Sequence, residues 1–298
     1  MEKVLQIDTV SQHDAFYHKE NLHPMVSVLD FTGTMPEEFA SRMRFGFYAV
    51  YLKDVKCGDI KYGRETYDYQ DRSLVFVAPG QVIHVSINDD YKPQGFALLF
   101  HPDLIRGTSL GKHISDYSFF SYTSREALHL SEKERKIILD CFEKIKYELE
   151  HAIDKHSKAL IVSNIELFLG YCIRFYDRQF ITRTDVNKGA VEQFENLLNE
   201  YFQSDKPQTL GLPAVNYFAD QLNLSANYFG DLIKKETGKS PHEYIQSKVM
   251  DVAKEKTLEG QKSVSEIAYE LGFKYPQHFT RAFKKSTGYT PNEYRNLN

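Results

Sequence analysis

The sequence lacks most of the features that mark membrane, secreted or zinc-binding proteins. Its apolar runs are far shorter than the ~18–20 residues that a membrane span needs, and Met1-Glu2-Lys3 does not begin a signal peptide. Its 3 cysteines, Cys57, Cys141 and Cys172, lie far apart and form no C-x-x-C pair, so we expect buried, reduced thiols rather than disulfides. These absences favour a soluble cytoplasmic protein, and 298 residues suffice for two domains.

Motifs for catalysis are missing as well. No phosphate-binding loop, Ser-His-Asp order or pair of carboxylates stands out from the rest of the sequence. We therefore expect that the protein is not an enzyme and that it needs no cofactor.

What the sequence does contain is a repeat in its C-terminal part. Residues 228–244, YFGDLIKKETGKSPHEY, and residues 278–294, HFTRAFKKSTGYTPNEY, are identical at 8 of 17 aligned positions. A second matching block precedes each copy at an offset of 49, with Val215, Ala219 and Leu222 aligned to Val264, Ala268 and Leu271. Two blocks joined by a segment that differs by one residue predict helix, turn and helix, duplicated.

Each copy has the pattern of two amphipathic helices. The first helix of the first copy is expected to bury Val215, Phe218, Ala219 and Leu222. Pro213 suits the first turn of that helix, because its missing N–H would be unpaired there. Ser225 is expected to cap the next helix, and Gly238 to end it in the left-handed conformation. The second helices are expected to turn inward Phe229, Leu232 and Ile233 in one copy and Phe279, Ala282 and Phe283 in the other.

The second copy carries a specific resemblance. Val264–Arg295, VSEIAYELGFKYPQHFTRAFKKSTGYTPNEYR, resembles the signature half of the AraC/XylS family of bacterial transcription regulators, and residues 241–258 resemble its linker helix. The similarity covers about residues 190–298. It implies a sequence-specific DNA-binding regulator, an activator or a repressor, that places two recognition helices in successive segments of the major groove. Without it, two hairpins of an ordinary helical domain would explain the repeat.

Polar residues on the outer faces of the second helices are the candidate contacts to DNA bases: Asn227, Gly230, Asp231, Gln277, Thr280 and Arg281. The candidate phosphate contacts are Lys234, Lys235, Lys274, Lys284 and Lys285. Arg281 can donate two hydrogen bonds to guanine, and Gln277 can pair with adenine. Family members commonly have arginine where Asp231 stands, so this chain departs from the pattern there. We therefore expect the second copy to read most of the sequence.

Positive charge is scarcer than in most DNA-binding domains. Residues 191–298 carry 13 Lys and Arg against 14 Asp and Glu, a net charge of −1. Residues 274–289 nevertheless hold 4 basic residues and no acidic one, whereas residues 226–239 have a net charge of only +1. Attraction to phosphates should therefore be concentrated on the second copy.

The N-terminal part has short β-rich runs between residues 44 and 100, and Ala78-Pro79-Gly80-Gln81 is the clearest turn. Large apolar residues alternate with polar ones, as at Tyr48, Val50 and Leu52, which predicts an antiparallel sheet folded over a core. In the AraC/XylS family the partner of the DNA-binding half is often a small cupin-like barrel that senses a ligand. LVFVAPGQVIH resembles the proline-glycine turn of that barrel followed by a histidine, His84.

That similarity does not extend to a metal site. Metal-binding cupins need an H-x-H pair with a later Glu and a second His, whereas here only His84 follows Gly80, with one residue more than the usual spacing. His13, His18 and His23 are spaced by five and lie upstream of the strands. We expect no metal, and a structural or ligand-facing role for His84.

The aromatic residues of these strands fit two roles. They either line a pocket for a planar or sugar-like effector or simply pack the core: Phe45, Phe47, Tyr48, Tyr51, Tyr62, Tyr67, Tyr69 and Phe76. The sequence leaves both roles open.

Two helices are expected between the strands and the repeat. Ser131-Glu132-Lys133-Glu134 is a capping-box sequence. The apolar stripes that follow consist of Ile138, Phe142, Ile145 and Leu149, then of Ile161, Ile165, Phe168, Leu169, Cys172 and Ile173. Stripes of this kind form an antiparallel pair that either covers the barrel or, as the resemblance implies, pairs with a second subunit. The segment 182–185 follows as the expected linker, and a helix beginning near Val191 opens the DNA-binding half.

The sequence thus predicts an α+β protein with a cupin-like antiparallel β-barrel at residues 1–181, including a helical dimerisation hairpin at about 131–181. An all-α domain with two helix-turn-helix motifs is expected at residues 190–298. The expected partners are double-stranded DNA, a second copy of the chain, a small-molecule effector and RNA polymerase, but no membrane. The alternative from another class is a small-molecule-binding or metal-dependent cupin enzyme with a helical tail.

Overall fold

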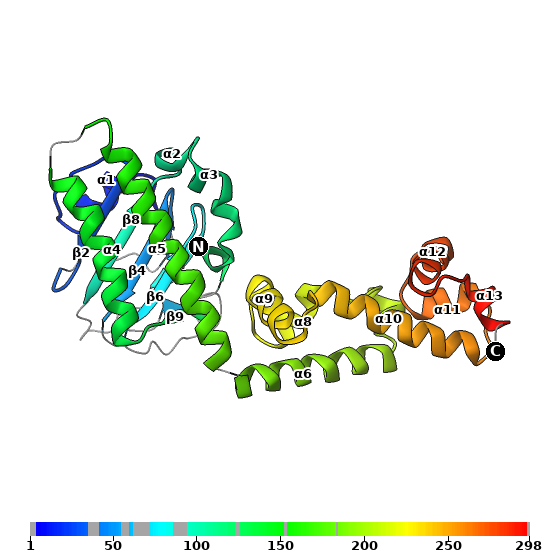
Figure 1. Ribbon diagram of the computed structural model, residues 1–298. Coiled ribbons are helices and arrows are strands. Elements are labelled where there is room, and N and C mark those ends of the chain that lie inside the picture. Colours follow the sequence, from blue (N-terminus) through cyan, green and yellow to red (C-terminus); the bar gives the residue numbers. More distant parts are fainter. Residues whose placement is uncertain are drawn as a thin grey trace. The chain divides into compact units, whose positions relative to one another are not determined.

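The computed structural model describes residues 4–34, 42–54, 60–61, 72–85, 94–122, 126–151, 154–182 and 184–296. The chain forms two compact units, Met1–Thr182 and Arg183–Asn298. The first unit combines strands with covering helices, and the second consists of helices (Figure 1).

Two sheets form the centre of the first unit. One has the order β1 (Leu5–Ile7), β3 (Arg42–Phe45), β7 (Val82–Val85) and β5 (Ile60–Lys61). The other has the order β2 (Val26–Asp30), β8 (Gly95–Phe100), β4 (Tyr48–Lys53), β6 (Ser73–Val77) and β9 (Leu128–His129). Within the described residues β1 and β3 pair in parallel, and no strand belongs to both sheets. The described strands therefore make two facing sheets and do not close into the expected barrel.

A break at Gly46 separates β3, which ends at Phe45, from β4, which begins at Tyr48 and belongs to the other sheet. The N–H of Gly46 donates to the carbonyl of Ile7, and a Cβ on Gly46 would lie 2.5 Å from the backbone oxygen of Asp8. Only glycine permits this close approach of two backbones. The turn at Ala78–Gln81 is confirmed, with Gly80 at a φ of +82°.

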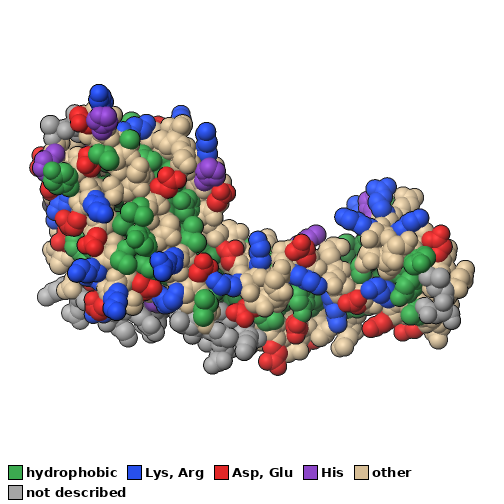
Figure 2. Space-filling view, viewed as in Figure 1, with side chains coloured by type: hydrophobic (Ala, Val, Ile, Leu, Met, Phe, Trp, Pro, Cys, Tyr) green, Lys and Arg blue, Asp and Glu red, His purple; other side chains and the backbone are tan. Residues whose placement is uncertain are grey.

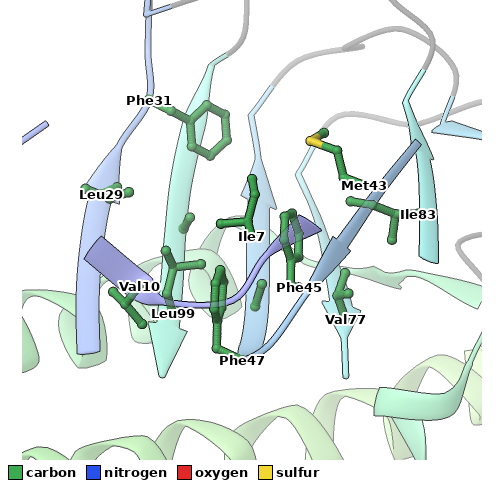
Figure 3. Close-up of a cluster of buried hydrophobic side chains, with 12 residues drawn as sticks. Ile7, Val10, Leu29, Phe31, Met43, Phe45, Phe47, Val77, Ile83 and Leu99 are labelled. Atoms are coloured by element: carbon green, nitrogen blue, oxygen red, sulfur yellow. The ribbon is translucent and has the colours of Figure 1, made fainter. Parts of the chain in front are cut away.

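The space between the two sheets is filled by apolar side chains. The short helix α1 (Val10–Phe16) contributes Val10, which has no exposed surface. Figure 3 shows this residue together with Phe45, Phe47 and Leu99 among the side chains that enter the space between the strands. Burial of this cluster supplies the main favourable free energy of the unit, at roughly 25 cal/mol per Å² of apolar area.

His13 of α1 is the polar exception in this interior. Its ring is 1% exposed, its Nε2 lies 3.0 Å from the hydroxyl of Tyr51, and the rings of Tyr17, Phe45 and Phe47 surround it at centroid distances of 4.9 to 5.8 Å. Among the described residues its Nδ1 has no hydrogen-bond partner. Burial lowers the pKa of His13 from 6.5 to about 3, so the imidazole is neutral at pH 7.

Acidification is therefore expected to destabilise the first unit through His13. The unfolded chain takes up this proton below pH 6.5, whereas the folded chain does not until about pH 3, so stability is complete above pH 6.5 and falls below it. At pH 4.5 the free energy of unfolding should be lower by about 3 kcal/mol than at pH 7. Urea unfolding of the wild type and of His13→Leu at both pH values measures this loss.

The test compares the wild type with His13→Leu, because Asp14 also titrates. Burial raises the pKa of the neighbouring Asp14 carboxyl, so protonation of Asp14 makes the folded state more stable as the pH falls, opposite to the effect of His13. Between pH 7 and pH 4.5 the free energy of unfolding of His13→Leu should fall by about 3 kcal/mol less than that of the wild type. Equal losses in the two proteins would show that His13 is not the group that titrates.

The predicted aromatic residues divide between the two faces of the second sheet. Phe45, Phe47 and Tyr51 lie near His13 between the sheets. Tyr48 stacks on Phe100 at 4.9 Å on the opposite face, and Phe76 lies there too, against the segment η2 (Ser118–Ser121). Tyr62, Tyr67 and Tyr69 lie outside the described residues. The five described residues therefore do not line one common surface.

Helices α4 (Glu132–Glu150) and α5 (Ser157–Thr182) cover the outer face of the second sheet (Figure 1). The capping box of Ser131 and Glu134 is confirmed. The rings of Phe142 and Phe168 lie 5.3 Å apart. Of the residues in the two expected stripes only Ile173 is exposed, at 45%, whereas these are buried: Ile138, Phe142, Ile145, Leu149, Ile161, Ile165, Phe168, Leu169 and Cys172. The apolar side chains of both stripes are thus buried within a single chain.

Ion pairs fix both helices to the unit. The guanidinium of Arg135 donates two hydrogen bonds to Asp54, at 2.6 and 2.5 Å, and Arg178 pairs with Glu134 at 2.9 Å.

Two smaller helices, α2 (Pro102–Ile105) and α3 (Ser109–His113), and the 3-10 turn η1 (Ile114–Asp116) precede η2.

Helix α5 is, within the described part of the chain, the one helix long and apolar enough to cross a membrane by length and composition. Its apolar face is occupied inside the first unit, where Phe168, Leu169 and Cys172 have no exposed surface. A core helix of a folded domain passes the same test, so this helix is weak evidence for a membrane span.

The second unit consists of α6 (Thr184–Gln203), α7 (Lys206–Leu210), α8 (Val215–Gln221), α9 (Ala226–Thr237), α10 (Pro241–Leu258), α11 (Val264–Glu270), α12 (Pro276–Thr287) and α13 (Pro291–Arg295). Helix α6 begins seven residues before the expected start at Val191. Arg183, inside the expected linker 182–185, and the side chains of its other three residues lie outside the described part.

Most of the helix-start and helix-end residues expected in the repeat are confirmed. The hydroxyl of Ser225 accepts from the N–H of Tyr228, and Gly238 ends α9 with a φ of +74°. The expectation for Pro213 is wrong, since α8 begins at Val215 with Ala214 as its N-cap. Pro213 instead precedes the cap, where its fixed φ also fits an extended backbone.

Candidate nucleic-acid interface

Two helix pairs, α8 with α9 and α11 with α12, carry the candidate site. In the first pair, the ring of Phe194 from α6 lies 5.2 Å from Phe218 of α8 and 5.1 Å from Phe229 of α9. All three side chains have no exposed surface. Edge-to-face aromatic packing of this kind fixes the angle between α8 and α9, and therefore the direction in which the outer face of α9 points.

The second pair is built in the same way, with α10 packed against α11 and α12 as α6 is packed against α8 and α9. Phe279 and Phe283 of α12 are fully buried, and their rings lie 5.6 Å apart. Phe273, in the turn before α12, lies 5.4 Å from Phe279, and Tyr294 of α13 lies 5.4 Å from Phe283. The apolar faces predicted from the repeat are therefore the buried faces, which leaves the polar faces outside.

The six predicted base-contacting residues lie on those outer faces. Asn227, Gln277 and Arg281 are exposed, whereas Gly230, Asp231 and Thr280 are half-buried. No atom lies within 4 Å of the place where a Cβ on Gly230 would stand, so the surface there is open. The hydroxyl of Thr280 donates to the carbonyl of Pro276 at 3.0 Å, which leaves its methyl group and a lone pair for a partner.

The five predicted phosphate contacts are all exposed: Lys234, Lys235, Lys274, Lys284 and Lys285. Four of them occupy the last turns of α9 and α12, and Lys274 lies just before α12. Figure 2 shows Lys and Arg side chains crowded over the part of the unit that holds α12. This is the stretch 274–289, which has no acidic residue.

Several acidic residues of 191–298 cap helices or pair with lysines, so the net charge of −1 over these residues is compatible with a basic surface at 274–289. Glu243, Glu266 and Glu293 close capping boxes at the starts of α10, α11 and α13. Hydrogen bonds from the backbone of Ser240 and of Thr290 lower the pKa of Glu243 and Glu293. Glu270 pairs with Lys256 at 3.0 Å and also with Lys262. These carboxylates are held at helix starts and in ion pairs outside 274–289.

The sequence interpretation missed two aromatic residues at the start of α12. Tyr275 is the N-cap of α12, makes no side-chain cap hydrogen bond, and is 49% exposed. The ammonium of Lys274 lies 5.8 Å from its ring, and the ring of His278 lies 5.4 Å away. The exposed pair Tyr275 and His278 borders Gln277 and Arg281. Their position directly around Pro276, a helix-start signal, could have identified them.

Comparisons with known proteins place a family model on this part of the chain and find relatives of the whole or a part of it. Residues 218–297 match the model of a helix-turn-helix domain family. Over 110 residues the chain is 33% identical to the "Uncharacterized HTH-type transcriptional regulator YtdP" of Bacillus subtilis, which covers 37% of this chain and 14% of YtdP. Over 238 residues it is 22% identical to the "Probable transcriptional regulator LumQ" of Photobacterium leiognathi, which covers 78% of this chain and 86% of LumQ.

Other matches cover a small share of the chain. A match to the HTH-type transcriptional regulator YobQ of Bacillus subtilis is 41% identical but spans 23% of this chain and 29% of YobQ. Among solved structures, the C-terminal domain of AraT, a response regulator from Geobacillus stearothermophilus, is 28% identical and covers 37% of this chain and 85% of that domain, with a TM-score of 0.33.

Proposed function

Because its C-terminal part is a helix-turn-helix domain of the AraC type, we propose that this chain is a sequence-specific DNA-binding transcription regulator. The outer face of α12 carries this proposal. It presents Gln277 and Arg281 beside Lys284 and Lys285, so it combines base-reading side chains with phosphate-binding ones on one exposed surface. A helix of 12 residues with such a face fits the width of the major groove.

Under this proposal the first helix pair contacts DNA at the same time as the second. Asn227 contacts a base, and Lys234 and Lys235 hold the adjacent phosphates and set the register. Gly230 has no side chain to read a base, and Asp231 reads at most the amino group of a cytosine. The two motifs therefore contribute unequally, with the second fixing most of the sequence.

Selection from a random pool of DNA duplexes tests the proposed function. The purified full chain is expected to enrich a common sequence over several rounds at 150 mM salt. Enrichment of no sequence, with retention that depends only on duplex length, would contradict a sequence-specific regulator.

Salt dependence tests the assignment of the phosphate contacts. Each lost contact lowers the slope of log K against log[salt] by about 0.9, so Lys284→Ala with Lys285→Ala should lower it by about 2. Fluorescence anisotropy on the selected duplex at four salt concentrations measures the slope.

The matched control for the salt experiment removes two lysines that pair with acids, by Lys254→Ala and Lys262→Ala. Their ammonium groups bind Asp251 and Glu270 outside the outer face of α12. The control should leave the slope unchanged within about half a unit. Equal slopes for both double variants would place the phosphate contacts elsewhere.

The first unit serves as the sensing part in this proposal, as a cupin-like domain that responds to a small-molecule effector. Its two facing sheets and the polar ring of His13 between them support this role. His84 lies on β7 in register with Arg42, and its side chain is outside the described residues. A metabolite panel that changes neither the melting temperature nor the DNA affinity of the full chain would leave this unit without a sensing role.

The proposed regulator is a cytoplasmic homodimer that acts on RNA polymerase. The outer face of α5 supports the dimer, because Leu160 and Leu167 are 47% and 45% exposed and lie seven residues apart on one side. Ser163 and Gly170, both exposed, lie on the same side and allow close approach of a second helix. An enzyme of the cupin class is the less favoured alternative, since the matched relatives are named as transcription regulators.

A further inference from the structure

A close backbone contact joins the loop before α8 to the turn between α11 and α12. Gly272, in the turn between α11 and α12, has a φ of +90°. A Cβ at this position would lie 2.5 Å from the carbonyl carbon and 2.6 Å from the carbonyl oxygen of Gly211, and 2.8 Å from the amide nitrogen of Leu212. Real Cβ atoms do not approach backbone so closely, so a side chain at position 272 would force the two segments apart.

Gly211 belongs to the loop between α7 and α8 and is held by the first part of the unit. Its N–H donates to the carbonyl of Pro207 at 3.0 Å, and its carbonyl accepts from the hydroxyl of Tyr201 at 2.9 Å. Tyr201 of α6 is 1% exposed, and its ring lies 5.3 Å from Tyr217 of α8. The loop is therefore fixed to α6 and α8.

Gly272 is held equally well by the second helix pair. Its N–H donates to the carbonyl of Tyr269 at 3.0 Å, and the N–H of Phe273 donates to the carbonyl of Ala268 at 2.9 Å. The ring of Phe273 in turn packs on Phe279 of α12. A displacement of this turn therefore displaces α12.

We propose that Gly272 is a positioning residue that sets the distance and angle between α9 and α12, and hence the spacing of the two DNA segments that the chain reads. The proposal rests on the proposed function. A single connecting helix such as α10 lets two domains bend and rotate about it, whereas a second point of contact removes that freedom. The absence of a Cβ at position 272 is what permits this second contact.

The test compares Gly272→Ala with the matched control Gly288→Ala. Gly288 has a similar φ of +83°, and no atom lies within 4 Å of the position of its Cβ. Both variants place alanine in the left-handed region, so both carry the same backbone strain. Only Gly272→Ala adds the clash between the two segments.

The first measurement needs no DNA. Hydrogen exchange followed by mass spectrometry should show exchange at residues 207–213 at least fivefold faster in Gly272→Ala than in the wild type. Gly288→Ala should be unchanged in that segment. Wild-type exchange at residues 207–213 in Gly272→Ala would overturn the contact, whether or not the chain binds DNA.

The second measurement uses the selected duplex and versions with one base pair inserted or removed between its two read segments. The wild type and Gly288→Ala should lose at least tenfold in affinity with either change. Gly272→Ala should bind best to a duplex with a changed spacing, or its affinities for the three duplexes should differ by less than threefold. A wild-type spacing preference in Gly272→Ala would overturn the proposal, whereas absence of selective binding by the wild type would overturn the proposed function.

A second variant keeps the test valid if Gly272→Ala does not fold. Tyr201→Phe removes the hydroxyl that donates to Gly211 and keeps the ring. It should produce the same two changes in the same direction, with exchange at residues 207–213 about twofold faster. No change in either measurement would count against the proposal.

Discussion

Replacing Phe142 with Asp is expected to unfold the first unit. Phe142 of α4 is 1% exposed, and its ring packs on Phe168 of α5. Truncating a buried Phe costs about 3–5 kcal/mol, and an unpaired charge left in its place adds several more. The sum is of the order of the whole stability of a domain, about 5–15 kcal/mol. Calorimetry of the full chain should show the transition of the first unit lost and that of the second unit retained.

Leu167→Asp is the matched control on the outer face of the same helix pair. Leu167 is 45% exposed in the single chain, so a carboxylate there stays in water and should change the free energy of unfolding of the monomer by less than about 0.5 kcal/mol. Light scattering should give a dimer for the wild type and a monomer for Leu167→Asp. A folded, monomeric Phe142→Asp would instead mean that the stripe of Phe142 is the dimer contact, as one interpretation of the sequence held.

Arg281→Ala is expected to weaken binding to the selected duplex by about 10- to 100-fold, and to relax selectivity at one base position. Arg281 is exposed on α12, and a bidentate pair of arginine with guanine contributes ~1–3 kcal/mol of discrimination. The loss should persist at 300 mM salt, because it concerns a base contact as well as a charge. Anisotropy titrations against the selected duplex and its single-base variants measure both effects.

Asp231→Ala is the companion variant at the equivalent place on α9. Removing a carboxylate near phosphates should leave binding as tight as in the wild type or tighter, with lower selectivity if Asp231 reads a cytosine. A larger loss of affinity for Asp231→Ala than for Arg281→Ala would show that the roles of the two helices are reversed.

The second unit could be predicted in detail because its signals are local. The repeat fixed the helix faces, and caps such as Ser225 and Gly238 depend on backbone geometry within a few residues. The contact of Gly211 with Gly272 could not be predicted in this way. It joins residues 61 positions apart, and a glycine in a turn is equally expected for local reasons alone.

The first unit was harder to predict because its strands depend on distant partners. The run over residues 45–53 has continuous strand-forming character, yet Gly46 turns the chain from one sheet to the other. α1, with a histidine in its middle, does not have the pattern of a core helix, and His13 is buried only because four aromatic rings enclose it. The stripes of α4 and α5 were identified correctly, and of the two roles left open for them, their burial within the same chain supports covering the sheet.

Chemical interference mapping on the selected duplex tests the central claim, that two helix pairs of one chain read neighbouring segments of the major groove. Methylation of guanine N7 blocks the groove edge that arginine and lysine read. For each bound chain we expect two clusters of interfering guanines, about 10 base pairs apart, with the stronger cluster lost in Arg281→Ala. A single cluster per chain, or interference that Arg281→Ala leaves unchanged, would contradict it.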